Sequence, residues 1–156
     1  MRRNIFLIYL ALLSLTLFAS PLERYESKIL FYAKEYNLTP AFIKNFILAE
    51  SSGNPYALNF NKDGTVDIGL LQQNSRSIPD FYRWYNKGKP YDPLDWEENL
   101  RISLAHFARM RKKTGSLKGA LCAYNMGLTG YYEYQAGKRP LPEETKILIK
   151  RVLKEF

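Results

Sequence analysis

Cysteine and histidine are almost absent from this sequence. The 156 residues include one cysteine, Cys122, and one histidine, His106. A single cysteine cannot form an intramolecular disulfide, so the core has to supply the stability of the fold. The same scarcity argues against a structural zinc site and against a Cys–His catalytic pair. Cys122 lies in the apolar stretch ALCAY, which predicts a small buried side chain. His106 lies on a predicted helix beside Phe107, which favours a structural role.

Internal repeats, low-complexity tracts and long linkers are also missing from the chain. A sequence of this length ordinarily forms one domain. Apolar residues make up 46% of the chain, enough for one core of ordinary size, and aromatic residues make up 15%. Aromatic side chains fill cores and also stack on ligands, and packing is the favoured interpretation for any single one.

The N-terminus has the pattern of a secretory signal. The basic pair Arg2–Arg3 precedes an almost unbroken apolar run, Ile5–Ala19, which is followed by a small residue. This run is shorter than the roughly 20 residues of a comfortable membrane span. We therefore predict a signal peptide over residues 1–19 and one domain over residues 20–156. The alternative is an uncleaved anchor, and the absence of a cysteine after the run argues against lipid attachment.

Basic residues outnumber acidic ones, giving a net charge of +8. The positive charges are scattered, apart from a modest cluster at Arg109, Arg111, Lys112 and Lys113. Nucleic acid is one partner that suits such a balance. The export signal instead favours an anionic polymer or a membrane surface outside the cytoplasm, and a solvated helix end explains the cluster equally well. We therefore expect an exported, periplasmic protein that does not bind nucleic acid, held at the inner membrane if the signal stays uncleaved.

Most of the chain has the apolar periodicity of helices. A first helix is predicted over Glu23–Tyr36, with an apolar face made by Ile29, Leu30, Tyr32 and Ala33. Thr39–Pro40 marks the start of a second helix, because a hydroxyl caps the N-terminus and proline suits the first turn. That helix runs through AFIKNFILAES and stops at the Gly53–Asn54–Pro55 break.

The segment over residues 54–75 loses helical periodicity and is predicted to be a small hairpin or loop around the turn at Asp63–Gly64. Residues 75–89 form an aromatic-rich short helix or lid. Further helices are predicted over Asp95–Lys113, over residues 117–127 after the cap Ser116, and over Pro142–Phe156, with a Tyr-rich turn or short helix at 129–135. The fold class is therefore mainly α, with one small non-helical insertion.

Glu50 interrupts the apolar stripe of the second helix. The stripe runs through Ile43, Phe46 and Ile47, and a carboxylic acid takes the next place on it, in the last turn. Burial raises a carboxyl pKa, and the negative end of the helix dipole acts in the same direction. Both effects favour a protonated acid near neutral pH, which general acid catalysis requires. The alternative is a helix-end glutamate that turns to solvent or pairs with a cation.

The stretch ESSGNPYALNFNKDGTVDIGLLQQNS, residues 50–75, resembles the catalytic region of c-type lysozymes and of the lysozyme-like SLT family of lytic transglycosylases. The matching residues are Glu50, Ser51, Pro55, Ala57, Asp63, Gly64, Thr65, Asp67, Gly69, Gln72, Asn74 and Ser75. In this resemblance Asp67 stands where lysozymes carry their second carboxylate.

The second half of the chain favours the transglycosylases over the lysozymes. Ala123–Tyr124–Asn125 followed by Gly127 resembles the AYNxG motif of SLT-type enzymes, and Asn99–Leu100 and Glu144–Thr145 resemble two further family motifs. Leu148 departs from the pattern, since many members have tyrosine there. The sequence NKDGTVDIGLLQ is similar to that of small specialised members associated with secretion systems and pili.

The resemblance implies an α+β lysozyme-like fold and a muramidase that cleaves peptidoglycan by lytic transglycosylation, without cofactor or metal. Glu50 would be the catalytic acid and base, and Asp67 would be a second carboxylate, a stabiliser or a turn residue. Substrate binding would fall to Ser51, Gln72, Tyr124 and Asn125, although Ser51 suits a turn cap equally well. A lysozyme that adds water, and a glycan-binding scaffold without turnover, are the alternatives. The expected partners of this monomer are glycan strands and, as a further candidate, a secretion or pilus assembly.

Overall fold

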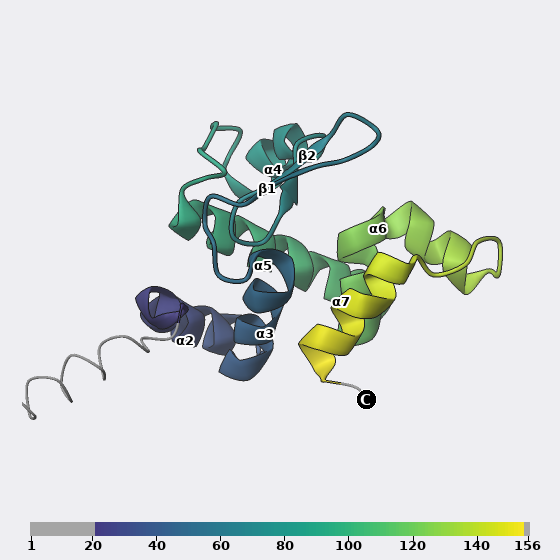
Figure 1. The fold of residues 1–156 in the computed structure, drawn as a ribbon, viewed down its shortest axis with the longest axis horizontal. Helices are drawn as coiled ribbons and strands as arrows, with labels where there is room; N and C mark the ends of the chain where they lie inside the picture. The colour runs from purple at the N-terminus through teal and green to yellow at the C-terminus, as the bar shows by residue number, and fades with distance from the viewer. Residues whose placement is uncertain (1–20, 155–156) are drawn as a thin grey trace, which may run out of the picture.

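Six α-helices and a small antiparallel sheet form the part of the chain that this computed structural model describes, residues 21–154 (Figure 1). The signal peptide predicted for residues 1–19 lies outside this range. The elements in chain order are η1 (Glu23–Tyr25), α2 (Glu26–Glu35), α3 (Pro40–Ser51), β1 (Leu58–Phe60), β2 (Val66–Ile68), β3 (Gln73–Asn74), α4 (Ile78–Tyr85), α5 (Trp96–Thr114), α6 (Leu117–Gln135) and α7 (Glu143–Leu153). This is the mainly α fold with a small β insertion that the sequence predicts.

Helix α3 runs through the middle of the molecule and begins and ends where the sequence predicts. The Thr39 hydroxyl accepts a hydrogen bond from the backbone N–H of Phe42 at 3.1 Å, and Pro40 occupies the first turn. The helix ends at Ser52, which adopts a left-handed conformation with φ 55°. Between these ends, Ile43, Phe46 and Ile47 are completely buried.

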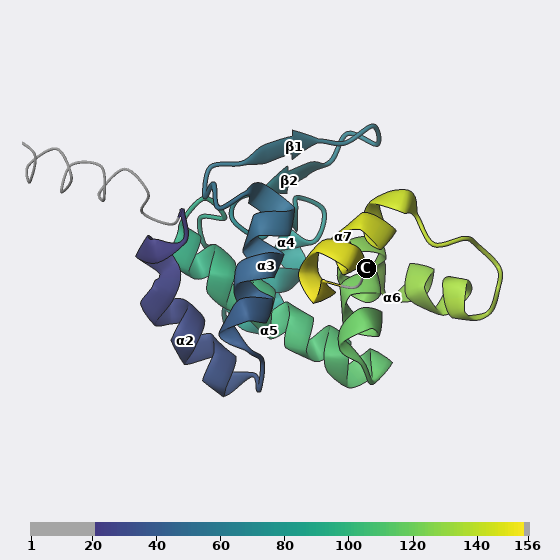
Figure 2. The ribbon, with the colours of Figure 1, turned by 60° about the horizontal axis from the view of Figure 1, so that its bottom comes forward.

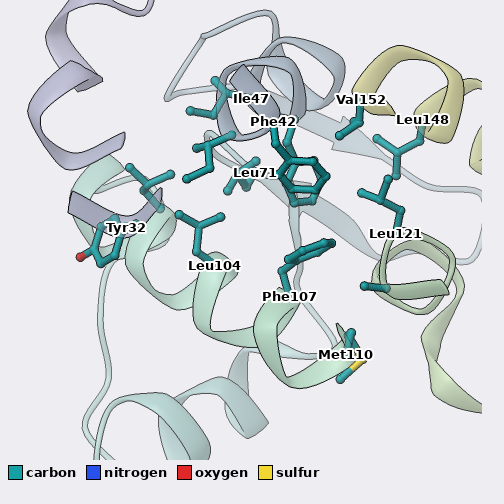
Figure 3. Packing of buried hydrophobic residues seen from close by; sticks show 14 of the residues in the cluster. Tyr32, Phe42, Ile47, Leu71, Leu104, Phe107, Met110, Leu121, Leu148 and Val152 are labelled. Carbon is teal, nitrogen blue, oxygen red and sulfur yellow. The ribbon is translucent and has the colours of Figure 1, made fainter. Parts of the chain in front are cut away.

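The core lies where α3, α5, α6 and α7 meet. Figure 3 shows Phe42 and Phe107 at its centre, with Leu121 and Val152 approaching from α6 and α7. The Phe107 ring lies 5.2 Å from that of Phe42 and 5.6 Å from that of Phe46, in tilted geometries that aromatic pairs prefer. Cys122 is 2% exposed within this core, which confirms the prediction of a small buried side chain.

The sheet has the strand order β1-β2-β3 and lies over the C-terminal end of α3 (Figure 2). Its register pairs Asp67 with Asn59 on one side and with Asn74 on the other. Directly opposed residues point to the same face of a sheet, so one face carries this polar row.

Three predictions need correction or refinement. Leu30 does not belong to the apolar face of the first helix: it is 51% exposed, because each residue turns a helix by about 100° and Ile29 already faces the core. The Tyr-rich segment is a short helix rather than a turn: the predicted break is present at Gly127, whose angles are non-helical (φ 75°, ψ 161°), and α6 therefore consists of two helical segments joined by a kink. The final helix ends at Leu153, before the predicted end.

Within residues 21–154, no helix combines the length and the apolar character that crossing a bilayer would require.

Candidate active site

Glu50 lies in the last turn of α3, on the side that the buried stripe of this helix faces. Its side chain is half-buried, and no group within residues 21–154 donates a hydrogen bond to its carboxyl. Burial raises the pKa of Glu50 to about 8, and the negative charge of Asp67 acts in the same direction. Glu50 is therefore protonated at neutral pH.

Asp67 sits on β2 in a different environment. Its Oδ2 accepts a hydrogen bond from the side-chain amide of Asn61 at 2.9 Å, and its Oδ1 accepts one from Asn74 at 2.7 Å. The amide of Asn59 lies 3.5 Å from Oδ2. An ionised carboxylate is only an acceptor, so these amide donors match its needs.

The two carboxyl groups therefore lie in different environments. Glu50 meets apolar neighbours and a nearby negative charge, while Asp67 meets a cluster of amides. Such a difference separates the proton donor from the charged partner in a pair of acidic residues. The arrangement can supply a proton to a substrate from Glu50 beside a fixed negative charge on Asp67.

Tyr124 joins α6 to this site. Its hydroxyl donates to the backbone carbonyl of Leu71 at 2.7 Å, and its ring packs edge-on against Phe46, with 5.0 Å between centroids. Burial raises the pKa of Tyr124, and the charge of Glu50 adds to the effect, so the phenol is close enough to sense that carboxyl. The hydroxyl remains a neutral donor that ties α6 to the loop between β2 and β3.

Two of the predicted substrate-binding residues make local hydrogen bonds. The Gln72 backbone is left-handed (φ 46°), and its Nε2 donates to the carbonyl of Gly69 at 2.9 Å and to that of Ala57 at 3.3 Å. The Ser51 hydroxyl donates to the carbonyl of Ile47 at 3.3 Å, one turn back in α3. Both contacts stabilise the backbone around the site, and the Ser51 contact fits the alternative of a cap.

Asn125 follows Tyr124 and is exposed. Its Oδ1 accepts a hydrogen bond from the hydroxyl of Thr145 at 2.5 Å, which ties α6 to α7. Thr145 is completely buried, so this bond satisfies a polar group inside the protein. The contact joins two motifs, AYNxG and Glu144–Thr145, that the sequence shows only as separate patterns.

A second group of residues, which the sequence does not reveal as partners, anchors the loop that precedes β3. Asn99 is completely buried, and its Nδ2 donates to the carbonyls of Ile68 at 3.0 Å and Pro93 at 2.9 Å, while its Oδ1 accepts from the N–H of Leu71 at 2.9 Å. Gln73 is 1% exposed and its Nε2 donates to the carbonyl of Asn99 at 3.1 Å. These bonds fix the loop to α5.

The amides around Asp67 were also missed as a group, although a signal for them exists. Asn61 closes the turn by donating its N–H to the Thr65 carbonyl at 2.9 Å. Counting outward from that turn places Asn59 opposite Asp67, and strand alternation then puts their side chains on one face. A firm hairpin register would therefore have predicted the amide cluster.

The aromatic residues of α4 pack in part against α5. The Arg109 guanidinium lies 4.0 Å above the Trp84 ring, and the Tyr85 hydroxyl lies 3.0 Å from Nδ1 of His106. Burial and the charge of Arg109 lower the pKa of His106 to about 4, so its ring is neutral at physiological pH. Within residues 21–154, no group of three or more histidine, cysteine or acidic side chains is arranged to hold a metal ion.

Comparison with known proteins agrees with this geometry. The family model of the "Transglycosylase SLT domain" matches residues 27–145. A relative described as "Membrane-bound lytic murein transglycosylase E" from Buchnera aphidicola subsp. Acyrthosiphon pisum (strain APS) is 33% identical over 104 residues. The aligned stretch is 62% of this chain and 44% of the relative, so the chain spans less than half of the relative's length.

Proposed function

Because this chain belongs to the transglycosylase SLT domain family, we propose that it is a lytic transglycosylase that cleaves the glycan strands of peptidoglycan. The bond cut is the β-1,4 linkage between N-acetylmuramic acid and N-acetylglucosamine. One observation carries most of the argument: Glu50 ends α3 in surroundings that raise its pKa to about 8. A protonated carboxylic acid at neutral pH is what glycosidic cleavage needs.

The chemistry assigned to Glu50 has two stages. The Glu50 carboxyl protonates the leaving glycosidic oxygen as an oxocarbenium-like centre develops at C1 of the muramic acid. The 2-acetamido oxygen of the substrate stabilises this centre from the other face. The Glu50 carboxylate then takes the proton from the C6 hydroxyl, whose oxygen bonds to C1 and closes a 1,6-anhydro ring. The reaction consumes no water.

Asp67 is assigned the role of a fixed negative charge near the developing positive charge. The amides of Asn61 and Asn74 hold its carboxylate on β2 and support this role. The amide groups of Gln72 and Asn125 retain donor or acceptor capacity for sugar substituents, since each amide offers both kinds of atom. Tyr124 supports the assignment by fixing the loop beside Glu50.

Mass spectrometry of digested peptidoglycan tests the proposal. The protein should release fragments with 1,6-anhydromuramoyl ends, and Glu50→Gln should retain the fold but lose cleavage by at least a thousandfold. Glu144→Gln is the matched control, because Glu144 is an exposed glutamate at the start of α7. Substantial cleavage by Glu50→Gln would refute the assignment of the acid.

The same experiment addresses the two alternatives. Reducing muramic ends would identify a lysozyme-type hydrolase, in which Asp67→Asn should remove most activity. In the transglycosylase, Asp67→Asn should slow the reaction and leave the anhydro product unchanged. A protein that binds glycan strands but leaves them intact would be a scaffold. The protonated state of Glu50 favours catalysis over that last alternative.

We assign the protein a place outside the cytoplasm, where peptidoglycan lies. The name of the Buchnera relative describes a membrane-bound protein, and the predicted signal peptide over residues 1–19 supports export to the periplasm. A monomer that works beside a secretion or pilus assembly remains our proposal for its setting. Detection of the mature N-terminus in periplasmic extracts would test export and cleavage together.

A further inference from the structure

A pocket of about 460 Å³ opens at the start of α3, at the end of the helix opposite Glu50. Four parts of the chain form it: the α2–α3 connection, the first turns of α3, the start of α6 and the end of α7. The residues used in the argument are Leu38, Ala41, Phe42, Leu117, Val152 and Lys154. Its volume is in the range of sites that hold a small ligand or a large side chain.

The floor of this pocket is apolar and recessed. Phe42 is 6% exposed and Val152 is 2% exposed, and both belong to the core. Leu38 and Leu117 are partly buried and pack against the same core. An apolar side chain entering the pocket would therefore extend the packing of the core and leave water.

The helix ends around the pocket are strongly basic. Of the described residues in the last turns of α2, α5 and α7 and in the α2–α3 connection, only Glu35 is acidic. Arg111 donates to the carbonyl of Asn37, a pocket residue, at 3.0 Å, which places one guanidinium at the rim. The basic residues at these ends include Lys34, Arg111, Lys112, Lys113, Arg151 and Lys154.

The basic side chains at the ends of α5 and α7 are exposed to solvent. Lys112 and Lys113 on α5, and Arg151 and Lys154 at the end of α7, are exposed. Within residues 21–154 no carboxylate lies within ion-pair distance of these four side chains. Cations at helix C-termini interact favourably with the helix dipole, which accounts for each one singly. The dipole does not account for the position of Arg111 and Lys154, from separate helices, at one apolar recess.

The basic rim and the catalytic end lie apart. Helix α5 is capped by Asp95, carries Glu97 and Glu98 in its first turn and ends in basic residues, and its 19 residues span about 28 Å. Along α3, the pocket residues Ala41, Phe42 and Asn45 precede Glu50 by about 8–14 Å, at 1.5 Å per residue. Figure 2 shows the sheet at one end of α3 and the start of α6 and the end of α5 near the other. A molecule in the pocket would leave the site at Glu50 open.

We propose that this pocket is a docking site for an acidic segment of a partner protein, which inserts one large apolar side chain while its carboxylates meet the basic rim. Charge complementarity selects an acidic partner. The recess selects a protruding anchor, since buried anchors in pockets supply most of the affinity of such contacts. An anionic membrane fits less well. Proteins insert protruding apolar side chains into a lipid surface, whereas the apolar residues of this pocket are recessed behind the basic side chains.

The probe for this proposal is a synthetic peptide of glutamates around one central tryptophan, titrated into ¹⁵N-labelled protein. We expect backbone shifts at the α2–α3 connection, at Leu117 and at the end of α7, and an increase in tryptophan fluorescence. The copy with alanine in place of tryptophan should bind at least tenfold more weakly. Equal binding of both peptides would reduce the contact to non-specific charge attraction and overturn the proposal.

Two kinds of variant measure separately how the basic rim and the apolar pocket contribute to peptide binding. Arg151→Glu with Lys154→Glu should weaken peptide binding at least tenfold, whereas Lys87→Glu with Lys89→Glu should leave it unchanged. The second pair is a matched control because both lysines are exposed and lie between α4 and α5. Ala41→Phe, which adds bulk at the exposed rim of α3, should block the tryptophan and leave glycan cleavage intact. Equal loss in both charge-reversed pairs would overturn the proposal.

Two other occupants would also overturn it. One is an anionic membrane: phosphatidylglycerol vesicles would then sediment the protein through Arg151 and Lys154, while the peptide caused no shifts in the pocket. The other is the end of this chain: the peptide would then enter the pocket only in the Phe156→Ala variant. Binding of the peptide to the unaltered protein, with neither of these results, supports the docking site.

Discussion

The two acidic side chains of the site, Glu50 and Asp67, lie in different electrostatic surroundings. Glu50 has apolar surroundings and no hydrogen-bond donor among the described residues, so the neutral acid is favoured. Asp67 has amide donors on both carboxyl oxygens, so the carboxylate is well accommodated. The negative charge on Asp67 also discourages ionisation of Glu50. This division determines how the activity and the stability depend on pH.

The rate of glycan cleavage should fall at alkaline pH. The proton donor is lost as Glu50 ionises, and its pKa is about 8. We expect kcat/KM to decrease about tenfold per pH unit above that value, since the rate follows the protonated fraction. Asp67→Asn removes a charge that raises this pKa, so the decrease should begin at a lower pH. An alkaline limb that does not move in Asp67→Asn would contradict the coupling.

The stability of the fold should also depend on the ionisation of Glu50. The folded-state pKa of Glu50, about 8, exceeds its ordinary value of 4.5, so its favourable contribution is complete below pH 4.5 and is lost as the pH rises to 8. Glu50→Gln cannot ionise. It should therefore be more stable than the parent by roughly 4 kcal/mol at pH 8 and about equal at pH 4. Urea unfolding at several pH values measures this difference, with the exposed Glu144→Gln substitution as the control.

At the scale of elements, the loop between β2 and β3 depends on α5. Asn99 is inside the protein and bonds to backbone groups on both sides of the loop, and Gln73 continues the contact into β3. Gly69 is left-handed, and a side chain there would collide with Asn99 and the carbonyl of Pro93. Because Tyr124 donates to Leu71 in the same loop, α5 and α6 together position the backbone beside Glu50.

Asn99→Ala should therefore destabilise the fold by about 4 kcal/mol. The substitution leaves the buried N–H of Leu71 and the carbonyls of Ile68 and Pro93 without their partner, and each unsatisfied group costs about 1–3 kcal/mol. Chemical denaturation measures the loss. Asn54→Ala is a suitable comparison, because the Asn54 side chain also accepts a backbone hydrogen bond but is exposed, and it should cost under about 1 kcal/mol. Similar losses in both would show that burial is not decisive.

At the scale of the whole molecule, His106 lies where three helices meet. It projects from α5, packs against Phe81 of α4 with 4.8 Å between ring centroids, and approaches the Tyr124 ring of α6 at 5.6 Å. Its Nδ1 pairs with the Tyr85 hydroxyl. A neutral imidazole suits this junction, because burial and the charge of Arg109 both oppose protonation. His106 therefore helps to hold α4 against α5 and α6, and protonation at acid pH would place a charge at this junction.

Acid should weaken this junction. The folded-state pKa of His106, about 4, is below its ordinary value of 6.5, so the contribution to stability is complete above pH 6.5 and is lost as the pH falls to 4. Relative to His106→Gln, the parent should lose roughly 3 kcal/mol over that interval. Thermal unfolding of both proteins across the interval checks this. The sign is opposite to that for Glu50, and a stability difference that stays constant from pH 6.5 to 4 would argue against a neutral buried ring.

Local signals in the sequence determined the helices and the place of Glu50 in the last turn of one of them. Thr39–Pro40, Ser116 and Gly115 act through hydrogen bonds and dihedral angles within a few residues, so their effects can be predicted without the fold. The place of Glu50 on an apolar stripe follows from helical periodicity in the same way. Leu30 shows the limit of that reasoning, because apolar character alone did not reveal which side of α2 the core would cover.

Only the tertiary structure decided which distant residues meet. The register of the sheet brought Asn59 and Asn74 to Asp67, the packing of α5 brought Asn99 to the loop before β3, and α7 brought Thr145 to Asn125. It also gathered the basic ends of separate helices around the pocket at the start of α3. The pairing of Asn59 with Asp67 follows from the hairpin turn between them. The other contacts join side chains or helix ends that only the folding of the chain brings together in space, so no local pattern could predict them. The sequence specified the chemical groups, and the packing of the helices and the sheet specified their partners.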